Sequence, residues 1–135
     1  MSLYVDSSAL LKRYVDEPDS DVAEALLTGE DSLLTARHTI VEVRRSLARL
    51  LSGQELARAR STFVDDLEAL SLIELDEVTC EAAASVAELT GARTLDALHL
   101  AAARRVGGPA AVPFLTFDVR QAQAARALGL TVLGA

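Results

Sequence analysis

The chain has 135 residues and a formal net charge of −7, from 20 acidic and 13 basic side chains. This balance argues against a protein that coats nucleic acid with a basic surface, but it is compatible with a nuclease, because a metal site gathers acids in one place. A single cysteine excludes an internal disulfide and a cysteine-based zinc site. No apolar run reaches about 18 residues and no signal peptide is recognisable, so we expect a cytoplasmic protein that does not cross a membrane.

Short apolar runs alternate with amphipathic segments from one end of the chain to the other. Short strands that alternate with helices indicate an α/β fold, with a mostly parallel central sheet covered by helices on both faces. The length fits a single domain over residues 1–135. In chain order, the sequence predicts a strand over 3–5, helices over 9–15 and 19–27, a strand over 32–35, helices over 39–51 and 55–70, a strand over 72–75, helices over 77–89 and 95–106, a strand over 114–117, a helix over 120–128 and a strand over 131–133.

Four acidic residues stand at junctions between a predicted strand and the helix that follows it. Asp6 comes directly after the first strand, and Glu42 lies in the first turn of the helix after the second. Asp96 lies in the first turn of a later helix, and Asp118 follows the fourth strand. In parallel sheets, ligands bind outside the carboxyl ends of the strands, where the chain turns into the next helix. We therefore expect these four carboxylates to share one crevice.

Each of these acids, taken alone, also has a purely structural explanation. Asp6 and Asp118 suit the N-cap of the helix that they precede. Glu42 stands three residues after Thr39, which is the spacing of a capping box. Asp96 is favourable at the positive end of a helix dipole.

Together, four carboxylates in one crevice repel one another strongly. Such a cluster is stable only with shifted pKa values or with a bound cation. Oxygen ligands suit a hard ion, Mg²⁺ or Mn²⁺, which lowers the pKa of a bound water and stabilises charge that develops on phosphorus. One carboxylate that does not bind the metal can orient or deprotonate that water. The pattern thus predicts hydrolysis of a phosphodiester with a 3′ oxygen as leaving group.

Four segments carry a resemblance to a known family: "YVDSSALLKRYVDEPDS", "TIVEVRRSL", "TLDALHLAAA" and "FLTFD". In this order and spacing they resemble PIN-domain proteins, and specifically the VapC toxins of bacterial toxin–antitoxin pairs, over nearly the whole chain. The resemblance implies a PIN-like three-layer fold and a Mg²⁺- or Mn²⁺-dependent endoribonuclease that cleaves RNA. It also implies a homodimer and a cognate antitoxin. Carried over residue by residue, it implies metal-binding and catalytic roles for Asp6, Glu42, Asp96 and Asp118.

Three further residues are candidates for substrate binding. Ser7 and Thr116 stand where members of this family often have a hydroxyl near the site, although either can be an ordinary turn or strand residue. Arg93 flanks the crevice in sequence and suits an RNA phosphate, but surface ion pairs with the many acids explain it equally well.

The two histidines are weaker candidates for the site. His99 stands three residues after Asp96, on the same face of the predicted helix, and His38 is near the second junction. A metal or base role is conceivable for both. We favour the interpretation that each is hydrogen-bonded within the fold.

Two other functions remain open at this stage. A phosphatase on a similar sheet needs a second acid two residues after a nucleophilic aspartate, and a supporting lysine. Here Ser8 occupies that position, and the single lysine, Lys12, lies on the first helix. A binding module without catalysis is the other alternative, with the four junction acids serving as helix caps.

Overall fold

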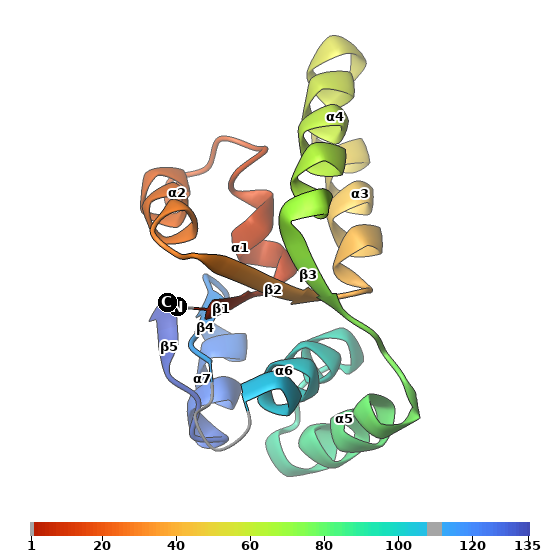
Figure 1. Cartoon of the computed structure of the whole chain (residues 1–135), viewed down its shortest axis with the longest axis vertical. Coiled ribbons are helices and arrows are strands. Elements are labelled where there is room, and N and C mark those ends of the chain that lie inside the picture. Colours follow the sequence, from red (N-terminus) through yellow and green to blue (C-terminus); the bar gives the residue numbers. More distant parts are fainter. Residues whose placement is uncertain (1, 108–111) are drawn as a thin grey trace.

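Five parallel strands form one sheet in the order β3-β2-β1-β4-β5 in the computed structural model, which describes residues 2–107 and 112–135 (Figure 1). Every paired strand is parallel to its neighbour. The elements are β1 (Ser2–Val5), α1 (Ser7–Leu11), α2 (Ser20–Thr28), β2 (Ser32–Ala36), α3 (Thr39–Leu50), α4 (Gly53–Ala69), β3 (Leu70–Ile73), α5 (Glu77–Thr90), α6 (Thr94–Gly107), β4 (Phe114–Thr116), α7 (Val119–Ala127) and β5 (Val132–Gly134). The predicted α/β fold with a parallel sheet is confirmed.

Helices cover both faces of this sheet because side chains along each strand alternate between the two faces. On one face, Leu3 and Val5 of β1 pack in a core with residues of α1, α2, α3 and α4. On the other face, Tyr4 packs with residues of α5, α6 and α7, and its ring stacks on Phe114 of β4 at 5.2 Å between centroids. Figure 1 shows the two groups of helices on opposite sides of the sheet. The result is the three-layer arrangement expected from the sequence.

The strand order places a topological switch point between β1 and β4. From β1 the chain continues to β2 and β3 on one side, whereas β4 and β5 lie on the other side. Connections therefore leave these two neighbouring strands in opposite directions, which opens a crevice at their carboxyl ends. Asp6 follows β1 and Asp118 caps the helix after β4, so both acids lie at this crevice.

Two elements differ from their predicted ranges by at least two residues at both ends. The first helix spans Ser7–Leu11 rather than 9–15, because the Asp6 side chain accepts a hydrogen bond from the Ala9 amide and starts the helix early. The third strand spans Leu70–Ile73 rather than 72–75, since its pairing with β2 ends at Ile73 and the chain then leaves the sheet. Neither shift moves a junction acid away from the carboxyl edge.

Among the described residues, no helix combines the length and the apolar character that a membrane span needs.

Gly134, at the edge of the sheet in β5, is a position where a side chain is not accommodated. Its φ is +97°, and an added Cβ would lie 2.4 Å from the carbonyl oxygen of Thr116. We expect Gly134→Ala to lower the free energy of unfolding by about 1–3 kcal/mol, as measured by denaturant unfolding. Gly91→Ala is the matched control, because Gly91 has a φ of +74° but open space around it. An equal loss in both variants would contradict a role for the close approach to Thr116.

Candidate active site

Asp6 is the most buried of the four junction acids, with 4% of its surface exposed. Its Oδ1 accepts a hydrogen bond from the Ser8 hydroxyl at 2.7 Å and one from the Ala9 amide at 3.0 Å. The N-cap role predicted for Asp6 is therefore confirmed. A buried carboxylate needs more than one cap bond to remain charged, because burial removes the water that would solvate it.

The environment of Asp6 makes its negative charge costly. Burial raises the pKa of Asp6, although the charge of His99 and the hydroxyls of Thr116 and Ser8 act in the opposite direction. A carboxylate held in this state gains stability from a cation placed against it.

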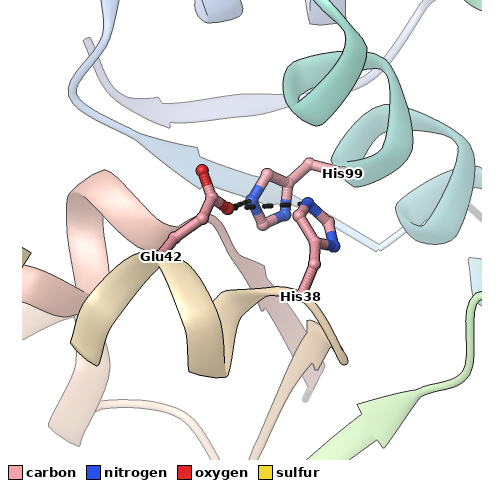
Figure 2. Close-up of side chains that lie close together, drawn as sticks. All are labelled: His38, Glu42 and His99. Carbon is pink, nitrogen blue, oxygen red and sulfur yellow. Dashed lines mark hydrogen bonds and ion pairs between the residues drawn. The ribbon is translucent and has the colours of Figure 1, made fainter. Parts of the chain in front are cut away.

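Glu42 extends from the first turn of α3 toward the sheet instead of capping its helix. The helix begins after His38, whose side chain makes no cap hydrogen bond, and the Thr39 hydroxyl lies 2.7 Å from the Thr35 hydroxyl. The capping-box explanation for Glu42 is therefore wrong. Its Oε1 instead lies 2.7 Å from Nε2 of His99 and 3.5 Å from Nε2 of His38 (Figure 2).

These contacts keep Glu42 ionised. Burial raises the pKa of Glu42. The hydrogen bond with His99, the charges of His99 and His38 and a hydrogen bond with the side chain of Ser7 lower the pKa by more than burial raises it, so the net shift is downward. The pKa of Glu42 is therefore lowered, whereas that of Asp6 is raised, although both acids belong to the same proposed site.

Both histidines are bonded within the fold, as favoured above. Nδ1 of His99 lies 2.7 Å from the Tyr4 hydroxyl, and this pair is buried. Nε2 of His38 lies 3.1 Å from the carbonyl oxygen of Leu95. Burial and the charge of His99 lower the pKa of His38 to about 4, so His38 is neutral at neutral pH.

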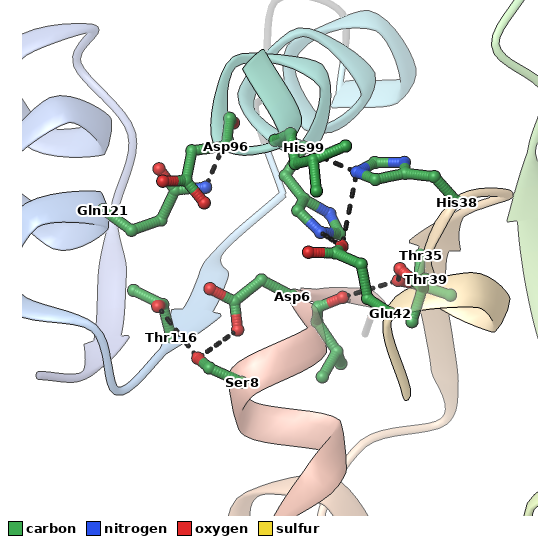
Figure 3. A network of polar contacts seen from close by, with 12 residues as sticks. Asp6, Ser8, Thr35, His38, Thr39, Glu42, Asp96, His99, Thr116 and Gln121 are labelled. Atoms are coloured by element: carbon green, nitrogen blue, oxygen red, sulfur yellow. Dashed lines mark hydrogen bonds and ion pairs between the residues drawn. The ribbon is translucent and has the colours of Figure 1, made fainter. Parts of the chain in front are cut away.

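Asp96 follows the turn between two helices, α5 and α6, so its predicted place at a strand-to-helix junction is wrong. Its carboxylate nevertheless interacts with the charges of the other three acids. Burial raises its pKa, and the negative charges of Asp118, Asp6 and Glu42 raise it further, against the opposite effect of His99. Figure 3 shows the side chains of Asp6, Glu42 and Asp96 approaching one another from the end of β1, from α3 and from α6. The structure thus places Asp6, Glu42 and Asp118 near enough to Asp96 for their charges to act on it.

Asp118 occupies the exposed side of the crevice. It caps α7 by accepting hydrogen bonds from the amides of Arg120 at 2.9 Å and Gln121 at 3.2 Å, so the cap predicted there is confirmed. With Asp96 and Arg93 it lines a cavity of about 620 Å³. Asp118 is therefore both a cap and a wall of the space next to the buried acids.

The three substrate-binding candidates all lie at this site. Ser7 acts on Glu42, as described above. Thr116 is fully buried, and its hydroxyl accepts a hydrogen bond from the Asp118 amide at 3.1 Å. Arg93 is exposed and borders the cavity beside Asp96. Their geometry suits Arg93 for contact with a ligand, whereas Thr116 holds the acids in place.

Two residues that the sequence did not single out for the site support it. Ser8 donates to Asp6, and its hydroxyl lies 3.5 Å from that of Thr116. The side-chain amide of Gln121 donates to the Asp96 carbonyl at 3.1 Å. Ser8 lies two residues after Asp6, and Gln121 lies three residues after Asp118. Their closeness in sequence to these N-cap residues is the pattern from which their role at the site could have been predicted.

The donor set fits a hard divalent cation. The ligand atoms are all carboxylate oxygens, from Asp6, Glu42, Asp96 and Asp118. Each carboxylate has two oxygens with about four lone-pair sites, so oxygen lone pairs remain for an ion after the hydrogen bonds within the fold are made. The raised pKa values of Asp6 and Asp96 show that their charged forms are destabilised, and a bound cation would stabilise these charged forms.

Fold and site together define a class: α/β proteins with an acidic site at the switch point of a parallel sheet. A PIN domain family model matches residues 3–127. The chain belongs to the PIN-domain family.

Known proteins resemble this chain over almost its entire length. Ribonuclease VapC45 of Mycobacterium tuberculosis is 35% identical over 135 residues, which cover 96% of this chain and 93% of the relative. Among solved structures, VapBC2 from Rickettsia felis, bound to a DNA fragment from its promoter, has a TM-score of 0.70 at 12% identity and covers 98% of both chains. Mycobacterium tuberculosis VapC20, a Sarcin-Ricin loop cleaving toxin, has a TM-score of 0.69 at 15% identity, covering 90% of this chain and 94% of that chain. At these identities the two structures bear on the fold.

Proposed function

We propose that this protein is an endoribonuclease that hydrolyses RNA phosphodiester bonds with Mg²⁺ or Mn²⁺ and acts as the toxin of a toxin–antitoxin pair. The observation that carries the proposal is the grouping of four acids around Asp96, where burial and the charges of Asp118, Asp6 and Glu42 raise the pKa of Asp96. The similarity to a protein named as a ribonuclease supports the choice of RNA over other phosphate esters.

Asp6, Glu42, Asp96 and Asp118 are the residues that would hold the metal. When bound, a divalent ion lowers the pKa of a water molecule and stabilises the negative charge that develops on the phosphate. The protein contributes the orientation of the carboxylates. Ser8 and the Ala9 amide fix Asp6.

The acids differ in the direction of their pKa shifts, which indicates different roles in the reaction. In the metal-free chain the pKa of Asp6 and that of Asp96 are both raised, so these two carboxylates are the ones that a bound cation would stabilise most. The oxygen of a water molecule forms a bond to phosphorus while the bond from phosphorus to the 3′ oxygen breaks. The proton of the water passes to a carboxylate, and the departing 3′ oxygen takes a proton from solvent. Glu42 remains ionised throughout because His99 donates to it.

Arg93 is the residue best placed to contact the RNA backbone. It is exposed and borders the cavity of about 620 Å³ that also contacts Asp96 and Asp118. A guanidinium at this position offsets the charge repulsion between RNA phosphates and the acids. Ser7 and Thr116 are retained as substrate-binding candidates through their effects on Glu42 and Asp118.

Loss of one acid is expected to abolish metal-dependent cleavage. The purified chain is incubated with RNA and either Mg²⁺ or Mn²⁺, and the same assay is run with Asp96→Asn. Since Asp96 combines a metal-ligand role with a raised pKa, we expect its cleavage rate to fall by about 100-fold or more. Asp21→Asn is the matched control, because Asp21 is an exposed acid in the first turn of α2, outside the site.

Two outcomes would contradict this function. Release of phosphate from small phosphomonoesters with RNA left intact indicates a phosphatase. RNA cleavage that survives in Asp96→Asn and needs no divalent ion indicates a different site or a contaminating nuclease.

The partners follow from the same family membership. We include in the proposal that residues 1–135 form a single PIN domain, that the protein is a cytoplasmic homodimer, and that a cognate antitoxin binds it. The name VapBC2 of a similar structure supports a second protein in the complex. Co-expression with the short reading frame next to the gene, followed by size-exclusion chromatography with light scattering, tests both the complex and the dimer.

A further inference from the structure

Glu42 belongs to a second donor set, which it forms with the two histidines. His38, Glu42 and His99 each offer one ligand atom within 4.8 Å of the others. Glu42 Oε1 lies 2.7 Å from Nε2 of His99 and 3.5 Å from Nε2 of His38, and the two imidazoles are 4.1 Å apart between ring centroids. Figure 2 shows the three side chains converging from α3 and α6. This set contains two nitrogens and one oxygen, whereas the four-acid site contains oxygens alone.

We propose that His38, Glu42 and His99 form a binding site for a transition-metal ion of the zinc class. This site differs from the hard-ion site in its two histidine ligands, and Glu42 belongs to both. Imidazole nitrogens favour Zn²⁺ and similar ions, whereas Mg²⁺ prefers oxygens. Two histidines and one glutamate are a ligand set that proteins use for zinc with an open position. Zinc–ligand distances of about 2.1 Å place tetrahedral ligands about 3.4 Å apart, close to the 2.7 and 3.5 Å that now separate Glu42 Oε1 from the histidines.

His99 is already held in the orientation that a metal ligand needs. A ligating histidine usually donates its second ring N–H to a nearby oxygen, which fixes its tautomer. Nδ1 of His99 lies 2.7 Å from the buried hydroxyl of Tyr4. When Nε2 binds the ion, the imidazole proton resides on Nδ1 and is donated to Tyr4. His99 Nε2 and Glu42 Oε1, now 2.7 Å apart, separate to admit the ion, while Nδ1 keeps its contact with Tyr4.

His38 has a hydrogen-bonding capacity that the fold does not use. It is 8% exposed, and its Nδ1 has no partner within the described part of the chain. A buried nitrogen without a partner carries a desolvation cost. Its Nε2 faces both Glu42 and the Leu95 carbonyl. On metal binding Nε2 supplies its lone pair to the ion and the proton moves to Nδ1. Unlike Nδ1 of His99, Nδ1 of His38 has no acceptor for that proton among the described residues, so the fold orients His38 less firmly as a ligand.

The test uses the tag-free chain with Cys80→Ser, because the exposed thiol of Cys80 is itself able to bind zinc. The chain contains two histidines, so long-range ¹H–¹⁵N spectra of the imidazoles report on this site without further mutation. We expect one equivalent of Zn²⁺ to shift the Nε2 resonances of both histidines. This measurement needs no RNA and does not depend on the proposed nuclease activity.

Matched variants then distinguish the two metal sites. In a competition titration with a chromophoric zinc chelator, His38→Gln and His99→Gln are expected to weaken Zn²⁺ binding by about tenfold or more, since even an outer-shell partner contributes that much. Asp118→Asn, which alters the hard-ion set alone, is expected to retain the affinity. If the histidine resonances do not move, or if Asp118→Asn loses Zn²⁺ while His38→Gln retains it, the ion binds among the acids and the proposal is wrong.

Discussion

Asp6→Asn is expected to abolish RNA cleavage while making the metal-free protein more stable at neutral pH. Asparagine keeps the shape of the side chain and is a good N-cap, so the bonds from Ser8 and the Ala9 amide to Oδ1 are preserved. What disappears is the buried charge that raises the pKa of Asp6. We expect a stability gain on the order of 1 kcal/mol, or about 3–5 °C in Tm for a chain of this length, together with a loss of cleavage of about 100-fold or more.

The stability gain has a defined pH dependence. The folded-state pKa of Asp6 lies above the ordinary value of 3.8, so protonation of Asp6 favours the folded state. That contribution is fully present below pH 3.8, and it is lost as the pH rises through the raised pKa. The advantage of Asp6→Asn is therefore complete at pH values well above the raised pKa of Asp6, and it shrinks as the pH falls through that pKa toward 3.8.

Thermal unfolding followed by circular dichroism at several pH values, without metal, measures this difference. Asp21→Asn, at an exposed acid in the first turn of α2, serves as the control and is expected to change stability little at any pH. An Asp6→Asn chain that is less stable than the unchanged chain at neutral pH would contradict the claim that burial of this charge is costly.

The parallel sheet and the position of its acids could be predicted because both depend on local sequence. Strands that alternate with helices indicate a parallel sheet, and the carboxyl ends of its strands share one edge. This is why we predict that the acids that follow or flank these strands lie at that edge. The strand order, with β1 next to β4, depends instead on packing between distant residues such as Tyr4 and Phe114, which no local pattern reveals.

The role of Glu42 was the least predictable part of the site. Its spacing from Thr39 suggested a capping box, but the Thr39 hydroxyl lies against Thr35, and His99 binds the carboxylate. Glu42 and His99 are 57 positions apart in the chain. Local spacing identifies the helix turn in which an acid lies, whereas the direction of its side chain is set by partners from other elements.

Addition of Mg²⁺ or Mn²⁺ is expected to raise the melting temperature of the protein. A ligand at 100 times its Kd stabilises the folded state by about 2.7 kcal/mol, which corresponds to about 8–13 °C for a chain of this length. The four carboxylates are the physical reason, because burial and the charges of the other three acids raise the pKa of Asp96 in the metal-free chain. Differential scanning calorimetry with increasing metal concentration measures the shift.

The variants connect this gain in stability to the site. Asp96→Asn and Asp6→Asn each remove one charge, so both are expected to lose most of the metal-induced increase, whereas Asp21→Asn retains it. Glu42 lies between the two donor sets, so Glu42→Gln is expected to reduce stabilisation by Mg²⁺ and binding of Zn²⁺ together. A metal-induced gain that persists in Asp6→Asn and Asp96→Asn means that the ion binds elsewhere. In that case the burial of Asp6 reflects helix capping alone, and the nuclease proposal loses its structural basis.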